Sequence, residues 1–373
     1  MKHPDIVLVI GDLGPGGSQR VVTTLANAWN DAGRTVAIVT LSDSESDFFE
    51  PHEGIIRRAI GQTADSGSFF RGVCANFRRI VALRRTFKEL RATNVVAFIG
   101  STNVLTVIAS LGLRTRVVIS ERNDPRRQPI GRAWRIMRRV FYPMADFVTA
   151  NSEAAMGYLG GFIPSRKLVY VPNPVAYDSE TSRAEIPETT ILTVASFTYQ
   201  KAHEVLLHAF AKIADSVPGW RLALIGEGEA ESQLRALADS LGIGTRIDWL
   251  GTVSNPFPYY RAAGLFVLPS RFEGTANVVL EAMSCGMPVI VTERSAGPSQ
   301  FVENGVSGLV VPVDDVSGLA SALLELIHDP DCRRRLAAEG TSRAKACTVD
   351  RVLAVWNEIV SNTTSHKRFN AVR

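Results

Sequence analysis

The chain of 373 residues has few cysteines and no long apolar run, and both shortages exclude classes of protein. Its four cysteines, Cys74, Cys285, Cys332 and Cys347, are widely spaced and form no CxxC pair. We therefore expect neither a disulfide framework nor a zinc site, which fits a reducing cytoplasm. No apolar stretch approaches the roughly 20 residues of a transmembrane helix. Residues 5–10 are expected to form a first strand and not a cleavable signal.

The chain also lacks the GxGxxG spacing of dinucleotide-binding folds. After the first apolar run comes a loop with adjacent Gly16 and Gly17, and no acidic residue ends the second predicted strand. This pattern disfavours a dehydrogenase. The two glycines fit either a simple tight turn or a close backbone approach to a ligand at the start of a helix.

The net charge of +4 is unevenly distributed, because residues up to 170 sum to roughly +9 and the remainder to roughly −5. The basic excess lies in residues 71–91 and 114–139. These stretches fit solvated helix faces, or an anionic partner such as a membrane surface, a lipid diphosphate or nucleic acid. Nucleic acid is disfavoured because no binding motif accompanies the charge. The arginines that would face a membrane are Arg78, Arg79, Arg84, Arg85, Arg126, Arg127, Arg138 and Arg139.

Short apolar runs alternate with segments of helical period through most of the chain, which predicts α/β architecture with doubly wound parallel sheets. In the first half the predicted strands are residues 5–10, 35–40, 94–99, 116–119 and 146–149. In the second half they are residues 191–195, 221–225, 246–249, 265–268 and 288–291. Two such series predict two Rossmann-like domains facing a central cleft, where ligands of such sheets bind.

The predicted domain boundaries lie where the alternation of strands and helices stops. We predict an N-terminal domain over residues 1–172 and a polar linker over 173–190. A second domain is predicted over residues 191–348, and residues 349–373 form a final helix and tail that pack back on the N-terminal domain.

Two glutamates, Glu273 and Glu281, stand eight residues apart around a small, glycine-led turn after the apolar run 265–268. The helix that follows offers free backbone N–H groups and the positive end of its dipole, which suit a phosphate. Carboxylates before and beyond that site match the ribose, diphosphate and sugar of a nucleotide-sugar. Lys201 similarly starts a helix after a strand, where a cation is unfavourable unless an anion binds nearby. A surface lysine is the alternative.

Other polar residues carry weaker signals. Asp329-Pro330-Asp331 matches the DxD pattern of some metal sites, but helix capping explains it better. His203 and His208 follow Lys201, and we interpret them as surface residues of the helix.

Taken in order, the motifs resemble the retaining glycosyltransferases of family 4, with the GT-B fold, of the bacterial surface-polysaccharide type. Glu273 and Glu281 fit the family's E-x7-E motif, and residues 16–21 resemble its GGxER-like loop. The remaining similar segments are residues 146–152, 171–175, Gly297-Pro298 and 304–309.

The resemblance implies a role for individual residues. Glu273 would contact the donor sugar, Lys201 would neutralise the leaving diphosphate, and both are predicted to be catalytic. The predicted donor-binding residues are Gly16, Gly17, Ser196, Lys201, Gly251, Val253, Glu273, Gly274, Thr275, Ala276, Asn277 and Glu281. The candidates on the acceptor side are Arg20, Glu121, Arg122 and Asn123.

Two departures from the family pattern stand out. The chain has Ala195-Ser196 where relatives often have Gly-Arg, and Arg122 or Arg20 is our hypothesis for the replacement. No histidine lies between His52 and His203, so the family's histidine in the first domain is absent.

The resemblance therefore implies a hexosyltransferase that moves a sugar from a nucleotide-diphospho-sugar, UDP-sugar favoured, to a saccharide acceptor. The basic first half, which faces the acceptor side in this architecture, favours a lipid-linked saccharide over a free one. Because helix capping explains the DxD match, we expect the reaction to be metal-independent. No cofactor is expected, because the nucleotide-sugar is a substrate, and no nucleic acid partner is expected. The predicted location is cytoplasmic, with peripheral contact to the inner membrane face. The alternatives are a non-hydrolysing nucleotide-sugar 2-epimerase and a catalytically silent nucleotide-sugar-binding protein.

Overall fold

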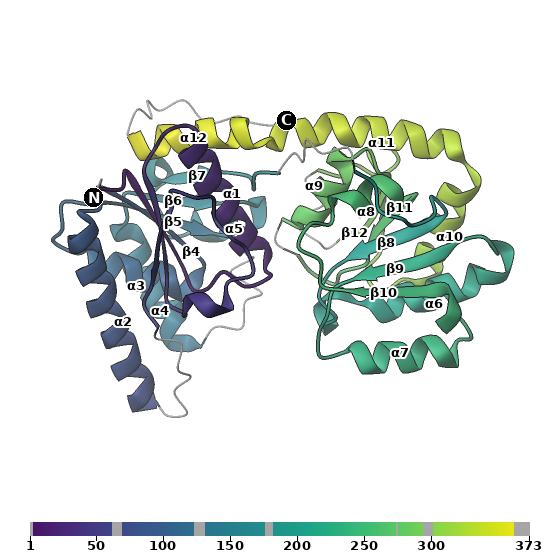
Figure 1. Cartoon of the computed structure of the whole chain (residues 1–373), viewed down its shortest axis with the longest axis horizontal. Coiled ribbons are helices and arrows are strands. Elements are labelled where there is room, and N and C mark those ends of the chain that lie inside the picture. Colours follow the sequence, from purple (N-terminus) through teal and green to yellow (C-terminus); the bar gives the residue numbers. More distant parts are fainter. Residues whose placement is uncertain are drawn as a thin grey trace. The chain divides into compact units, whose positions relative to one another are not determined.

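The computed structural model describes residues 3–61, 69–122, 131–175, 182–273, 275–293 and 301–361. The chain divides into two compact units. Unit 1 comprises Met1–Pro174 and Val349–Arg373, and unit 2 comprises Val175–Thr348. Each unit contains a parallel sheet with helices on both of its faces (Figure 1).

Unit 1 contains a seven-stranded sheet in the order β3-β2-β1-β4-β5-β6-β7, and all its paired strands are parallel. The strands are β1 (Ile6–Ile10), β2 (Val36–Thr40), β3 (Ile56–Ala59), β4 (Asn94–Phe98), β5 (Arg116–Glu121), β6 (Phe147–Ala150) and β7 (Leu168–Tyr170). The inner strands β1 and β2 are fully buried runs of apolar residues, because helices cover both faces of a parallel sheet.

The helices of unit 1 form two layers. The α-helices are α1 (Gly17–Asp31), α2 (Phe69–Leu90), α3 (Gly100–Ser110), α4 (Arg132–Phe141), α5 (Glu153–Leu159) and α12 (Val349–Ser361). The 3-10 helices are η1 (Ser44–Ser46), η2 (Tyr142–Met144) and η3 (Ser165–Lys167). Helices α2 to α5 pack on one face of the sheet, and α1 and α12 pack on the other.

The last helix, α12, belongs to unit 1 although unit 2 precedes it in the sequence. Trp356 of α12 packs edge-on against Trp29 of α1, with ring centroids 6.2 Å apart. The indole Nε1 of Trp29 donates a hydrogen bond of 2.9 Å to Oδ1 of Asn357. Both tryptophans are fully buried, so α12 completes the core on this face of the sheet.

Unit 2 contains a six-stranded parallel sheet in the order β10-β9-β8-β11-β12-β13. Its strands are β8 (Thr190–Val194), β9 (Arg221–Ile225), β10 (Ile247–Gly251), β11 (Leu265–Leu268), β12 (Val289–Thr292) and β13 (Leu309–Val311). Its α-helices are α6 (His203–Ile213), α7 (Glu231–Ser240), α8 (Phe257–Ala262), α9 (Asn277–Ser284), α10 (Val316–His328) and α11 (Pro330–Ala344). Its 3-10 helices are η4 (Tyr199–Lys201), η5 (Ala214–Ser216), η6 (Gly244–Arg246) and η8 (Lys345–Cys347). Helices α6 and α10 pack on one face, and α8 and α9 on the other.

The prediction of two doubly wound α/β domains is confirmed. All ten predicted strands are present, with ends that shift by at most two residues. Three strands were not predicted, namely β3, β7 and β13. They are only three or four residues long and only β13 is mostly buried, so the apolar run that marks an inner strand is missing or very short.

Candidate functional site

The carboxyl ends of β8 and β11 meet at the point where the strand order of unit 2 reverses. From β8 the chain adds β9 and β10 on one side, and from β11 it adds β12 and β13 on the other. Loops diverge at such a switch point and leave a crevice, where open α/β sheets bind ligands. Lys201 follows β8 and Glu273 follows β11, so both predicted catalytic residues lie at this point.

The structure joins these two side chains in an ion pair. Lys201 Nζ lies 2.5 Å from Glu273 Oε1, and the two side chains are 18% and 6% exposed. The hydroxyl of Ser270 donates a second hydrogen bond of 2.6 Å to the same carboxylate oxygen. Among the described residues, no contact reaches the other oxygen, Oε2. Glu273 is thereby held by one oxygen and can accept a ligand hydroxyl with the other.

Arg271 links the loop that contains Lys201 to the loop that contains Glu273. Its backbone N–H donates to the carbonyl of Gln200 at 2.8 Å, and the Gln200 amide donates back to the carbonyl of Phe272 at 2.8 Å. The Arg271 guanidinium lies 4.0 Å from the ring centroid of Tyr199 and pairs with Glu204 at 2.5 Å. Sequence reasoning missed Arg271, although it lies two residues before Glu273.

His203 does not lie at the surface, so our interpretation of that residue is wrong. Its imidazole is buried at the start of α6 and packs edge-on against Phe197, with centroids 4.9 Å apart. Burial, together with the nearby charge of Lys201, lowers the pKa of His203 to about 3. The ring is therefore neutral near pH 7 and a poor proton acceptor. His208 is exposed, as predicted.

Helix α9 begins directly after the glutamate loop. Ala276, its N-cap residue, has a left-handed backbone with φ of +48°, and no side chain caps the helix. Glu281 lies in the second turn and is 3% exposed, and Tyr260 donates a hydrogen bond of 3.2 Å to its Oε2. Thr275 is also buried, and Gly274 lies outside the described residues.

Close backbone contacts join the ends of β8, β9 and β10. A Cβ on Gly226, which has φ of +142°, would lie 2.1 Å from the carbonyl oxygen of Ala195. Gly226 N–H donates to the carbonyl of Gly251 at 2.8 Å. Ser196 is exposed at the end of β8, and Val253 is half-buried after β10. The predicted donor-binding residues of unit 2 that are described thus follow β8 and β11, lie at or just after the end of β10, or lie on α9, all at one edge of the sheet.

The predicted glycine loop lies in unit 1, between β1 and α1. Gly16 is the N-cap of α1, and Gly17 is the first residue of that helix. The carboxylate of Asp12 accepts hydrogen bonds from Gly14 N–H at 2.9 Å and from the Gln19 amide at 2.8 Å. Arg20 is half-buried in the first turn of α1. The loop therefore follows β1, which lies at the switch point of its own sheet beside β4.

Glu121, an acceptor-side candidate, is 1% exposed inside unit 1. Its carboxylate accepts hydrogen bonds from the Tyr142 hydroxyl and from Asn103, the latter at 3.4 Å, and lies 3.6 Å from Arg138. Burial raises the pKa of Glu121, although the Arg138 charge and these hydrogen bonds act in the opposite direction. The network ties the end of β5 to α3, α4 and η2.

One arginine that was predicted to face a membrane belongs to this same buried network, so that prediction is wrong. Arg138 is buried to 1% exposure on the inner side of α4, so it cannot face a membrane. Arg84 is also engaged, because its Nη1 donates to the carbonyls of Ala109 and Leu111 at 3.0 and 2.6 Å. Arg126 and Arg127 lie outside the described residues.

Arg122 is the other described acceptor-side candidate at the end of β5, since Asn123 lies outside the described residues. Its guanidinium is buried and donates to Asn173 Oδ1 at 2.6 Å and to the Val171 carbonyl at 3.2 Å. It also lies 5.4 Å from the ring centroid of Trp356. Burial lowers the pKa of Arg122 to about 9.

The capping interpretation of the DxD match is confirmed. Asp329 caps α11, and its Oδ1 accepts a hydrogen bond of 2.8 Å from Cys332 N–H, with Pro330 in the first turn. Within the described ranges, no cluster of three or more His, Cys, Asp or Glu side chains is arranged to hold a metal ion. No described helix combines the length and apolarity needed to cross a membrane.

Comparison with known proteins assigns a class to this fold and site. Residues 16–174 match the family described as "Glycosyl transferase 4-like domain", and residues 178–343 match the family described as "Glycosyl transferases group 1". The structure of Anabaena HepE in complex with UDP superposes with a TM-score of 0.79 at 19% identity, covering 96% of this chain and 99% of that one. The protein is therefore a glycosyltransferase with the GT-B fold.

Two bacterial relatives have names that state the substrate or the pathway of those proteins. A Campylobacter jejuni enzyme, GalNAc-α-(1→4)-GalNAc-α-(1→3)-diNAcBac-PP-undecaprenol α-1,4-N-acetyl-D-galactosaminyltransferase, is 25% identical over 95% of this chain and 98% of its own length. The lipopolysaccharide core biosynthesis glycosyltransferase LpsE of Rhizobium meliloti is 33% identical over 44% of this chain and 47% of its own. The homologues thus include bacterial glycosyltransferases that act on lipid-linked sugars and in surface polysaccharide synthesis.

Proposed function

We propose that the protein is a retaining glycosyltransferase of family 4 that moves a sugar from a UDP-sugar to a lipid-linked saccharide. The observation that carries the proposal is the Lys201–Glu273 pair at the switch point of unit 2, one loop before the uncapped N-terminus of α9. The UDP complex of the HepE neighbour supports UDP as the nucleotide, and the undecaprenol-linked substrate of the Campylobacter relative supports a lipid-linked acceptor.

In this proposal, different residues of unit 2 bind different parts of the donor. The Lys201 ammonium has three N–H donors, of which one reaches Glu273, so the others are available to diphosphate oxygens. The N–H groups at the start of α9 face the same negative charge. Glu273 holds the sugar through Oε2, and Glu281 binds ribose hydroxyls. Positive groups fixed before the reaction stabilise the charge that develops on the leaving diphosphate.

The proposed chemical step keeps the anomeric configuration. The bond between the sugar C1 and the diphosphate oxygen breaks, and the acceptor oxygen bonds to C1 on the same face. The acceptor proton passes to the leaving diphosphate oxygen, so no protein base is required. This route agrees with the burial and lowered pKa of His203, which make it unsuited to act as the base. Arg20 and Asn123 are proposed to bind the acceptor, whereas Glu121 and Arg122 are buried in hydrogen-bonded networks inside unit 1 and are not included.

The donor is tested by nucleotide release and thermal shift with UDP-, GDP- and ADP-sugars. We expect UDP-sugar turnover with a lipid-linked acceptor, and the anomeric configuration of the product, measured by NMR, should match that of the donor. Because Lys201 and α9 supply the positive charge, EDTA should leave the rate unchanged. An inverted product contradicts the mechanism, and loss of activity with EDTA that Mg²⁺ restores contradicts metal independence.

Two alternatives have distinct outcomes. A 2-epimerase would change the nucleotide-sugar without any acceptor, which product analysis in the absence of acceptor detects. A catalytically silent binder would show a thermal shift but no nucleotide release. Glu273→Gln should abolish turnover in a transferase and would leave the partner function of a silent binder intact.

The proposed location is the cytoplasmic side of a bacterial inner membrane, where a lipid-linked acceptor is presented. No cofactor is needed in this scheme, since the nucleotide-sugar is consumed as a substrate.

A further inference from the structure

Large apolar side chains are exposed on the outer faces of two helices of unit 1. They lie on α2 and on the segment formed by α4 and η2, and each set follows the i, i+4, i+8 spacing of one helix face. The residues are Val73, Phe77, Val81, Ile136, Val140 and Met144, and each is 50–66% exposed.

Neither set is needed for the fold, because each helix already buries a different apolar face. Leu83 and Phe87 of α2 face the core of unit 1, as do Trp134, Met137 and Phe141 of α4. The Arg138 side chain, held beside Glu121, anchors α4 from the same inner side. An amphipathic helix normally exposes polar residues opposite its core face, so a second apolar face indicates a partner.

Basic side chains flank both apolar faces. Helix α2 contains six Arg and Lys residues and one acidic residue, and α4 contains four Arg and no acidic residue. Of these four, Arg138 is buried on the inner side and is not part of the exposed face. Arg78 and Arg85 are exposed beside Phe77 and Val81, and Arg139 is exposed beside Ile136 and Val140. Apolar residues combined with Arg on one exposed side are typical of helices that lie in the interface of anionic membranes.

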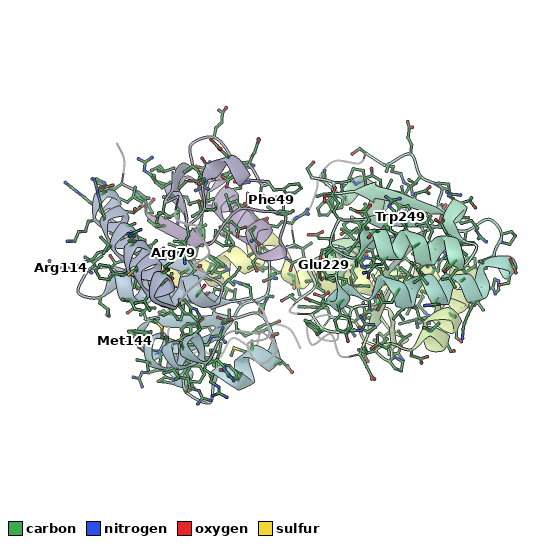
Figure 2. The ribbon with its side chains drawn as sticks, turned by 90° about the horizontal axis from the view of Figure 1, so that it is seen from below. Phe49, Arg79, Arg114, Met144, Glu229 and Trp249 are labelled. Atoms are coloured by element: carbon green, nitrogen blue, oxygen red, sulfur yellow. The ribbon has the colours of Figure 1, made fainter. Side chains whose placement is uncertain are left out.

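The two helices belong to the same side of unit 1. Both pack against α3 and join the same core on one face of the sheet, opposite α1 and α12. They lie in the lower part of unit 1 in Figure 1, and the view from below in Figure 2 labels Arg79 of α2 and Met144 of η2.

We propose that these exposed faces of α2 and α4–η2 form a membrane-docking surface, in which apolar side chains enter the interface of an anionic lipid bilayer and arginines contact the headgroups. The inference deepens the proposed function, since a lipid-linked acceptor lies in a membrane. A second copy of the chain fits less well, because two identical faces rich in arginine repel one another. Nucleic acid offers the phosphates but no apolar phase for Phe77 and Ile136.

The test is co-sedimentation of the full chain with vesicles of phosphatidylcholine alone or mixed with phosphatidylglycerol. The wild-type protein should bind the anionic vesicles and bind the neutral ones weakly. Phe77→Ser with Ile136→Ser should lower the partition coefficient by about tenfold or more, because the two most exposed apolar side chains of the surface no longer enter the bilayer. Arg78→Gln with Arg139→Gln should weaken the preference for anionic lipid and its dependence on salt, while the other arginines of the two helices retain part of both.

Matched control variants test whether vesicle binding depends on this surface, and not on the loss of any exposed arginine or apolar side chain. Arg351→Gln removes an exposed arginine from α12, on the other face of the sheet, and Val306→Ser removes an exposed apolar side chain from unit 2. Both should bind vesicles as the wild type does. The substituted side chains point outward, so thermal unfolding by circular dichroism should be unchanged, and each single variant is measured if the double variant is destabilised.

Three results would overturn the proposal. They are absence of wild-type binding to anionic vesicles, equal binding by the apolar variant, and a dimer in lipid-free solution that the apolar variant loses. Vesicle binding needs neither donor nor acceptor. A protein that binds vesicles but turns over no nucleotide-sugar therefore refutes the proposed function alone, and active enzyme that does not bind vesicles refutes this surface alone.

Discussion

Replacing Lys201 with Met tests the central pair of the candidate site through both stability and activity. The variant removes the cation 2.5 Å from a carboxylate that is 6% exposed and leaves Ser270 as the hydrogen-bond donor to that oxygen. Removing one partner of a fully buried pair costs about 3–5 kcal/mol. Because the Lys201 side chain is 18% exposed, water offsets part of this, and we expect a loss of about 2–3 kcal/mol in the free energy of unfolding.

The assay is a double-mutant cycle measured by urea unfolding, with Lys201→Met, Glu273→Gln and the combination. The pair should show a coupling energy of at least about 1 kcal/mol, since neighbours that share a buried contact are not additive. The matched control is Arg334 with Asp331, whose side chains are 74% and 86% exposed, and its coupling should be below about 0.5 kcal/mol.

The activity of the same variants is measured as nucleotide release. Losing one prearranged positive group from the leaving diphosphate should lower kcat by about 10²–10³-fold. A coupling energy equal to that of the exposed control, or wild-type kcat in Lys201→Met, would refute the reasoning that this pair is both buried and functional.

Three further predictions concern buried groups and the strand ends. His203, with its pKa lowered to about 3, binds protons more readily in the unfolded chain, so folding stability should fall as pH drops below about 6.5 towards 3. His203→Leu should flatten that part of the pH profile of urea unfolding, and an unchanged profile would contradict the assignment. Arg138→Met leaves Glu121 buried without its cation, which should cost about 3–5 kcal/mol. Because burial already raises the pKa of Glu121, the loss should grow as pH rises above 4.5, and a pH-independent loss speaks against it. Gly226→Ala places a methyl against a carbonyl oxygen and should lower the melting temperature clearly, whereas Gly219→Ala, with no heavy atom within 4 Å, should have little effect.

Much of the candidate site follows from local sequence. Glu273 lies in the turn after the buried strand β11, and Glu281 lies on the helix α9 that follows. Both positions are therefore set within one strand–turn–helix unit. Parallel strands all end at the same edge, so the approach of Lys201 to Glu273 follows once two strands are known to be neighbours.

The sequence by itself determined the two series of inner strands, because strands buried on both faces appear as continuous apolar runs. It also determined the cap at Asp329, because that hydrogen bond spans three residues. The burial of Arg138 and His203, the clamp made by Arg271, and the exposed second faces of α2 and α4 were decided only by the tertiary structure. Whether a side chain is covered depends on residues outside its own helix, which are Glu121 at the end of β5 for Arg138 and Phe197 in the loop after β8 for His203. The spacing of residue types within one helix does not predict whether such a side chain is covered.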